Sequence, residues 1–191
     1  MKNLKNKVVF FDRDGVICPN RPDYVKSWEE FVFLPGVKEA LKKLKKAGFQ
    51  SVVISNQSCI GRGIVSAKAV DEINLKMVEE IEKAGGEITR VYVCPHRIDE
   101  GCDCRKPKTG LFKKAAEDLN VKLSESYLIG DAESDILSGK AIGVKTVLVL
   151  TGLPEHPRSL EGLREAKPDF IAEDLGEAAD WILDLEQRET R

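Results

Sequence analysis

The chain has 191 residues with 30 basic and 32 acidic side chains, which leaves a net charge of −2. This length suits one domain that buries its own core, and the balanced charge argues against a dedicated nucleic-acid surface. No apolar run reaches membrane-spanning length, and the amino-terminal residues lack the hydrophobic segment of a signal peptide. We therefore expect a cytoplasmic monomer that forms one domain over residues 1–191 and binds neither nucleic acid nor a membrane.

The first strong pattern is a run of β-branched and aromatic residues, 8–11, that ends in Asp12, Arg13, Asp14 and Gly15. Such a run is typical of a strand buried on both faces at the centre of a parallel sheet. Ligands of these sheets bind at the carboxyl ends of the strands. Two carboxylates placed there on the same side of the chain favour a bound cation between them. An ordinary Asp-Gly turn is the alternative interpretation.

Strands then alternate with amphipathic helices, which predicts a doubly wound, mainly parallel α/β sheet. The later strands are predicted over Phe49–Ile54, Glu87–Val93, Tyr127–Gly130, Lys145–Leu150 and Asp169–Ala172. The helices are predicted over Gly36–Ala47, Ser66–Ala84, Thr109–Leu119 and Leu175–Glu186, with a frayed tail after Gln187. Residues 16–35 combine prolines with aromatic side chains, so we expect a minimal cap, a flap packed over the strand ends.

Two further predicted strands also end in polar side chains, because Ser55 follows the second and Asp131 follows the fourth. Pro107 suits the first positions of the helix after it, so Lys106 is predicted at the amino end of that helix, where an anion is favoured. Asp135 lies one helical turn beyond Asp131. Acids for a divalent cation, combined with a serine and a lysine for phosphoryl oxygens, indicate phosphoryl transfer.

Residues 94–104 carry two close pairs of metal-binding side chains separated by five positions, namely Cys94, His96, Cys102 and Cys104. Three thiolates and one imidazole form a closed tetrahedral zinc site with no open position, so we expect a structural Zn²⁺ in a zinc loop. Loop cysteines beside a solvent-facing histidine are the alternative. Cys18 and Cys59 have no partner in the sequence and are interpreted as packing residues.

Together these motifs resemble the four motifs of phosphatases of the haloacid dehalogenase superfamily. The matching residues are Asp12-Arg13-Asp14-Gly15, Ser55, Lys106 and Gly130-Asp131-x-x-x-Asp135. The resemblance implies a Rossmann-like fold and hydrolysis of a phosphomonoester through an aspartyl-phosphate, with Asp12 as the nucleophile and Asp14 as the general acid/base. It implies that Ser55 and Lys106 stabilise the phosphoryl group. Mg²⁺ would be held by Asp12, Asp131 and the main-chain carbonyl of Asp14, with Asp135 in support.

The zinc loop followed by Cys-Arg-Lys-Pro resembles the branch of histidinol-phosphate and heptose-bisphosphate phosphatases. Residues 56–63, 23–37 and 147–152 are similar to the heptose-bisphosphate side, which removes the 7-phosphate of a 1,7-bisphosphate, although Cys59 replaces a usual glycine. The short zinc loop is similar to the histidinol side, and Ala132 stands where a basic residue is usual. We therefore expect a small phosphorylated sugar as the substrate, with histidinol phosphate as the alternative.

The resemblance implies that the substrate contacts Asn56, Gln57, Ser58 and Arg105, and also Tyr24 unless that ring packs beneath the flap. A rival hypothesis from another class is a signalling module that accepts a phosphoryl group, because such modules also combine acids, a serine or threonine and a lysine on a doubly wound sheet. It predicts a long-lived phospho-aspartate without turnover. Asp14 argues against it, because its position suits an acid/base that speeds hydrolysis. A zinc-loop interaction protein with an inactive site is a third hypothesis.

Overall fold

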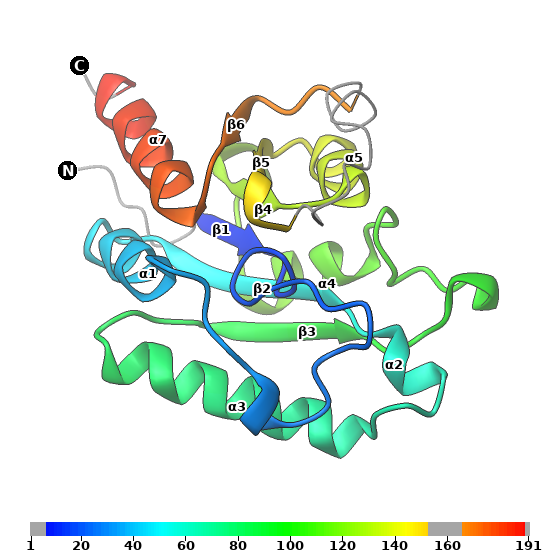
Figure 1. Ribbon diagram of the computed structural model, residues 1–191. Coiled ribbons are helices and arrows are strands. Elements are labelled where there is room, and N and C mark those ends of the chain that lie inside the picture. Colours follow the sequence, from blue (N-terminus) through cyan, green and yellow to red (C-terminus); the bar gives the residue numbers. More distant parts are fainter. Residues whose placement is uncertain (1–6, 153–165, 190–191) are drawn as a thin grey trace.

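A single parallel sheet organises the chain (Figure 1), as seen in a computed structural model that describes residues 7–152 and 166–189. The strand order is β3-β2-β1-β4-β5-β6, and every neighbouring pair is parallel. The strands are β1 (Val8–Phe11), β2 (Gln50–Asn56), β3 (Arg90–Cys94), β4 (Tyr127–Gly130), β5 (Lys145–Val149) and β6 (Phe170–Ala172). The predicted doubly wound, mainly parallel sheet is confirmed.

Helices cover both faces of this sheet, so β1 at its centre is buried on both sides. The helices are α1 (Val37–Lys46), α2 (Ser58–Gly61), α3 (Ala67–Lys83), α4 (Gly110–Leu119), α5 (Glu133–Ile142) and α7 (Leu175–Arg188). Val9 and Phe11 join the core beneath α1, α3 and α7, whereas Val8 and Phe10 join the core beneath α4. Alternate side chains of one strand thus serve two cores, which explains why the run contains no polar residue.

The order of the strands places a topological switch point at the end of β1. The chain moves outward from β1 to β2 and β3, and then returns to place β4 on the other side of β1. The connections that leave the carboxyl ends of β1 and β4 therefore diverge, and ligands of doubly wound sheets bind at such a switch point. Asp12 directly follows β1 and Asp131 directly follows β4, so both acids lie at this point.

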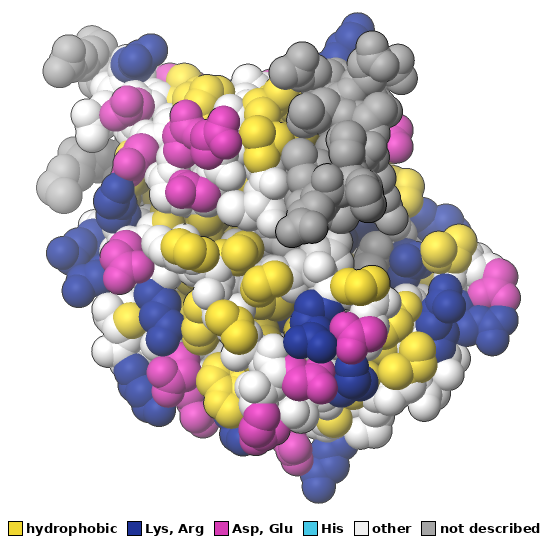
Figure 2. Space-filling model, in the orientation of Figure 1, with side chains coloured by type: hydrophobic (Ala, Val, Ile, Leu, Met, Phe, Trp, Pro, Cys, Tyr) yellow, Lys and Arg dark blue, Asp and Glu magenta, His cyan; other side chains and the backbone are white. Residues whose placement is uncertain are grey.

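Residues 16–35 contain one short 3-10 turn, Trp28–Glu30, and otherwise no regular element. Trp28 stacks on Phe31 with ring centroids 5.1 Å apart, and Phe33 meets both rings edge-on. These rings pack against the core beneath α1 and α3, so the segment is anchored by apolar burial. On the face shown in Figure 2 apolar side chains lie among charged ones, and Val32 of this segment is 61% exposed.

Element boundaries differ from the predicted ones at a few places. β2 includes Ser55 and Asn56, which were predicted to follow the strand, and β3 begins only at Arg90. The short α2 was not predicted, because four residues leave no measurable periodicity. His156, to which no role is assigned, and residues 190–191 of the predicted tail lie outside the described residues. Within residues 7–152 and 166–189, no helix has the length and apolar character of a membrane span.

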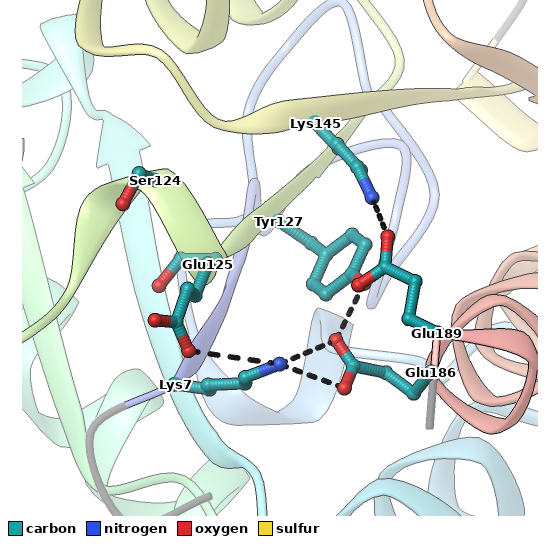
Figure 3. Close-up of a pocket in the computed structure, with 8 residues that line it drawn as sticks. Lys7, Ser124, Glu125, Tyr127, Lys145, Glu186 and Glu189 are labelled. Atoms are coloured by element: carbon teal, nitrogen blue, oxygen red, sulfur yellow. Dashed lines mark hydrogen bonds and ion pairs between the residues drawn. The ribbon is translucent and has the colours of Figure 1, made fainter. Parts of the chain in front are cut away.

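A polar pocket of about 310 Å³ lies at the amino ends of β1, β4 and β5, the edge of the sheet opposite the acids (Figure 3). The Lys7 ammonium, which is 4% exposed, donates to both carboxylate oxygens of Glu186 at 2.8 and 2.7 Å. The Tyr127 hydroxyl donates to the same carboxylate at 2.8 Å. Because Glu186 belongs to α7, this network ties the last helix to the first and fourth strands.

Replacing Glu186 with glutamine is expected to lower the free energy of unfolding by about 3 kcal/mol, because the buried Lys7 ammonium loses its nearest counter-charge and keeps only the half-exposed Glu125 carboxylate at 3.8 Å. Urea denaturation measures the change. Glu189→Gln is the matched control, because its ion pair with Lys145 is about 40% exposed on both sides and exposed pairs contribute about 1 kcal/mol or less. Equal losses in the two variants would contradict the role of the buried pair.

Candidate active site

Three acids from different elements converge at the switch point of the sheet. Carboxylate oxygens of Asp12, Asp131 and Asp135 lie within 4.8 Å of one another, a spacing that could hold a metal ion. Asp12 follows β1, Asp131 follows β4, and Asp135 lies in the first turn of α5, where it also accepts a hydrogen bond from the Ala132 N–H at 3.1 Å. Strand ends of one sheet thus gather residues that lie more than a hundred positions apart in the sequence.

Lys106 enters this acid cluster from the loop between β3 and α4. Its ammonium lies 3.0 Å from an oxygen of Asp12 and 2.6 Å from an oxygen of Asp135, and it donates to the Ile54 carbonyl at 2.8 Å. Burial opposes the charge, but the two carboxylates outweigh it and raise the pKa of Lys106. Three carboxylates and one ammonium leave two negative charges at the cluster, which matches the charge of one divalent cation.

Burial also changes the protonation of the acids. The pKa of Asp12 is raised to about 7, chiefly by desolvation and also by the charges of Asp135 and Asp14, although Lys106 opposes the rise. Desolvation, followed by the charges of Asp12 and Asp135, raises the pKa of Asp131 well above its ordinary value. Added positive charge reverses such shifts, so the pair is disposed to exchange its protons for a metal ion.

Asp131 reaches the cluster because two glycines leave space for it. A Cβ atom at Gly15 would lie 2.2 Å from the Asp131 Oδ2 atom, and one at Gly152 would lie 2.0 Å from it, both far inside contact distance. Gly15 also adopts a φ of +89°, which favours glycine. The Thr151 hydroxyl donates to the Gly15 carbonyl at 2.7 Å, so the segment after β5 is fastened to the turn after β1.

Asp14 points into a different set of contacts from Asp12. The Arg13 guanidinium donates to both of its carboxylate oxygens, from Nε at 3.2 Å and from Nη2 at 3.0 Å. The Gln57 amide donates to Asp14 Oδ2 at 2.6 Å and to the Ser55 hydroxyl oxygen at 2.8 Å. Asp14 and Ser55, which come from adjacent strands, are thus joined through one buried amide.

The residues predicted to contact a substrate differ in their surroundings. The Asn56 side chain donates to the Lys106 carbonyl at 3.2 Å and accepts from the Lys106 N–H at 3.1 Å, so it fixes the backbone that carries the lysine. The Tyr24 hydroxyl lies 3.3 Å from the Ser58 hydroxyl, and the Tyr24 ring packs against a small apolar cluster around α2. Arg105 donates to the His96 carbonyl at 3.3 Å.

The four residues of the predicted zinc loop form a second candidate metal centre. The Cys104 sulfur lies 3.1 Å from Cys94, 3.5 Å from Cys102 and 3.1 Å from the His96 Nδ1 atom, and the Cys94 and Cys102 sulfurs are 3.7 Å apart. A tetrahedral zinc with bonds of about 2.3 Å separates its sulfur ligands by roughly 3.8 Å. The thiols are free, and their separations fit a shared ion rather than a disulfide of about 2 Å.

The predicted placement of Lys106 at a helix terminus is wrong. α4 begins at Gly110, with Thr109 as its N-cap, so Lys106 and Pro107 precede it. The Lys108 N–H donates to the Arg105 carbonyl at 2.8 Å, which turns the chain before the helix starts. The buried carboxylates, rather than the amino end of a helix, therefore set the surroundings of the lysine ammonium.

Several contacts of the site were not predicted from the sequence. Cys18 contacts Asp14, and Asn20 contacts Asp131. Asn74 contacts Arg13, Thr151 contacts the Gly15 carbonyl, and Gly152 lies against Asp131. The contacts of Thr151 and Gly152 could have been suspected from the sequence, because a glycine just after a predicted strand often permits close approach of another group. Asn74 gave a weaker signal, as a polar residue on the apolar stripe of a helix.

Comparisons with known proteins identify the family. A model of HAD-hydrolase-like proteins matches residues 103–178. The D-glycero-beta-D-manno-heptose-1,7-bisphosphate 7-phosphatase of Neisseria meningitidis serogroup A is 36% identical over 186 residues, which cover 91% of this chain and 100% of the relative. The Pseudomonas putida protein of the same name is 39% identical over 155 residues, 81% of this chain and 87% of the relative. The chain is a haloacid-dehalogenase-like phosphatase.

A solved structure agrees with this membership of the phosphatase family. The D,D-heptose 1,7-bisphosphate phosphatase of B. bronchiseptica, complexed with magnesium and phosphate, superposes with a TM-score of 0.84 at 31% identity and covers 93% of this chain and 98% of its own. The predicted resemblance to the haloacid dehalogenase superfamily and its Rossmann-like fold is confirmed. As a phosphatase, the chain is an enzyme rather than a signalling module or an inactive interaction protein.

Proposed function

We propose that this phosphatase removes the 7-phosphate of D-glycero-D-manno-heptose 1,7-bisphosphate in a Mg²⁺-dependent reaction. The observation that supports it most is the cluster of Asp12, Lys106, Asp131 and Asp135, at the switch point of a sheet shared along almost the whole chain with relatives of that name. The acids and the lysine of this cluster suit phosphoryl transfer, and the names of the relatives suggest a heptose bisphosphate as the substrate.

The acid cluster fits Mg²⁺ as the catalytic ion. Mg²⁺ prefers oxygen ligands, and Asp12, Asp131 and the Asp14 carbonyl would hold it, while Asp135 supports the site and pairs with Lys106. The glycines at 15 and 152 leave the space that brings Asp131 to the cluster. Bound there, the ion would neutralise phosphoryl oxygens and keep the carboxylates ionised.

The side chains then divide the work of hydrolysis. A carboxylate oxygen of Asp12 bonds to phosphorus while the bond from phosphorus to the sugar oxygen breaks, and Asp14 gives that oxygen its proton. Asp14 next takes a proton from water, whose oxygen attacks phosphorus and releases phosphate together with the Asp12 carboxylate. Lys106 and Ser55 would donate to phosphoryl oxygens, where added charge develops in the transition state.

The residues near the cluster are proposed to have two kinds of role: some contact the substrate, and others orient the catalytic side chains. Arg105, Ser58 and Tyr24 are proposed to contact the sugar or its second phosphate, Arg105 through a forked contact. Asn56 and Gln57 were predicted to contact the substrate as well. Their side-chain amides instead donate hydrogen bonds to the Lys106 carbonyl, Asp14 and Ser55, so their proposed role is to orient those groups.

We also propose a structural Zn²⁺ held by Cys94, His96, Cys102 and Cys104. With four protein ligands the ion has no open position, so its role is to fix the loop of residues 94–104. Cys104 lies two positions before Lys106, and Arg105 between them donates to the His96 carbonyl. A bound zinc ion would therefore also fix the position of Lys106 in the acid cluster.

Asp12→Asn is expected to abolish hydrolysis of heptose 1,7-bisphosphate, because an amide cannot form the acyl-phosphate, while the melting temperature stays within a few degrees. Phosphate release measures the first and thermal denaturation the second. Glu29→Gln, an exposed change far along the flap, is the control and is expected to leave the rate unchanged.

Wild-type enzyme should also prefer heptose 1,7-bisphosphate over histidinol phosphate by at least 100-fold in kcat/KM, because a pocket built for one substrate leaves its polar groups unpaired with the other. Parallel assays of both compounds decide the choice. A preference for histidinol phosphate would refute the proposed substrate but not the proposed chemistry, and steady turnover by Asp12→Asn would refute the nucleophile.

Magnesium affinity is expected to rise with pH. The Asp12 pKa of about 7 means that this carboxyl holds a proton at pH 6 that the metal must displace, whereas at pH 8 it is ionised. The apparent Kd for Mg²⁺, measured by calorimetry, should fall roughly 10-fold or more between pH 6 and pH 8. Asp131→Asn should weaken binding at both pH values, and a pH-independent Kd would contradict the proton exchange.

Cys102→Ser is expected to reduce bound zinc, measured by atomic absorption, to below one fifth of the wild-type content, because a hydroxyl is a poor replacement for a thiolate ligand. The melting temperature should fall with it, since metal binding contributes to folding free energy. Cys59→Ala, which lies outside the cluster, is the control and should keep its full zinc content. Equal metal content in both variants would remove the zinc site.

A further inference from the structure

Arg13, the residue between the two motif acids, is almost completely buried at 1% exposure. A buried guanidinium is costly unless it is paired and hydrogen-bonded. Arg13 is therefore not an ordinary surface residue, and the mechanism proposed above assigns no role to it. Burial opposes its charge, but the neighbouring Asp14 carboxylate outweighs this and raises the pKa of Arg13, so the guanidinium stays charged.

The contacts of Arg13 form a relay that begins in α3 and ends at Asp14. The Nη1 atom donates to the Asn74 side-chain oxygen at 3.1 Å, and Asn74 is a buried residue of α3. On its other edge, Nε and Nη2 donate to the two oxygens of the Asp14 carboxylate. A planar fork of this kind holds both the direction and the tilt of a carboxylate, which a lysine ammonium cannot do.

Gln57 gives Asp14 a second support, at an oxygen that Arg13 also contacts. Its amide nitrogen donates to Asp14 Oδ2 at 2.6 Å, and the Cys59 thiol donates to its side-chain oxygen at 3.5 Å. Three nitrogen donors from two side chains, together with the Cys18 thiol at 3.5 Å, therefore hold a carboxylate that the proposed chemistry uses twice, first to give and then to take a proton.

We propose that Arg13, anchored by Asn74, is a positioning residue that sets the orientation of Asp14 for proton transfer to the leaving oxygen. The proposal deepens the proposed function and rests on Asp14 being its acid/base. It gives α3, which contributes no group to the acid cluster, an indirect part in the reaction through Arg13. Misplacement of a catalytic group by about 1 Å can cost roughly 100-fold in rate.

The test compares two leaving groups. Alkoxide leaving from a sugar phosphate needs a proton, whereas p-nitrophenolate leaves from p-nitrophenyl phosphate without one. Arg13→Gln is expected to lower kcat for heptose 1,7-bisphosphate roughly 100-fold, the lower end of what general acid catalysis contributes. Asn74→Ala should lower it roughly 10-fold, because the guanidinium itself remains. KM should change less than threefold. The rate constant of the pre-steady-state burst of p-nitrophenolate reports attack by Asp12 alone, and it should change less than threefold in Asn74→Ala. Arg13→Lys should retain an intermediate rate.

Controls separate this proposal from a merely structural role and from the proposed function. Leu75→Ala, on the same helix but 60% exposed, should leave every rate unchanged. Equal losses on both substrates in Asn74→Ala, or none on either, would overturn the positioning role even if the wild-type enzyme and Asp12→Asn behave as proposed. If wild-type enzyme cleaves neither substrate, the crystal structure of Asn74→Ala decides: a displaced Asp14 carboxylate supports the positioning and an unmoved one overturns it.

Discussion

The ion pairs of Lys106 are the contacts on which the rest of the site depends. Three buried carboxylates at one point would repel one another and take up protons, and the lysine ammonium between Asp12 and Asp135 is the fixed positive charge that offsets this. When all three acids are ionised, two negative charges remain uncompensated, and a divalent cation would balance them. The same ammonium lies beside the proposed nucleophile and would meet the phosphoryl oxygens, so one side chain serves stability and chemistry together.

The fold supplies this arrangement by order of strands rather than by any one contact. β1 is central and carries the acid pair, β4 beside it carries Asp131, and β2 on its other side carries Ser55. Lys106 lies outside this scheme, because it arrives on an irregular loop. The loop is held from two sides, by the Asn56 amide on its backbone and by the cluster of cysteines and histidine that ends at Cys104. Irregular backbone at a reacting centre needs such external support.

Much of this could be predicted from the sequence, and the exceptions share a cause. The buried run before Asp12 predicts a central strand, because its apolar pattern is local. Acids after strands predict a shared edge, because the carboxyl ends of parallel strands meet at one edge of a sheet. The packing of Asn74 on Arg13 could not be predicted, since it joins residues 61 positions apart through the crossing of a helix over a sheet. The start of α4 lies within one residue of the prediction, but Lys106 was wrongly placed at its amino end, because Pro107 suits a turn as well as a first helical position.

The nearness of the sulfur cluster to Lys106 has a practical consequence on the proposed metal assignment. A strong chelator removes loosely held Mg²⁺ but also competes for a thiolate-bound ion, so treatment meant to empty one site would disorganise the loop that carries the lysine. Activity lost in this way would not return on adding back magnesium alone. Enzyme stored in EDTA would for the same reason be recorded as inactive although its acid cluster is intact.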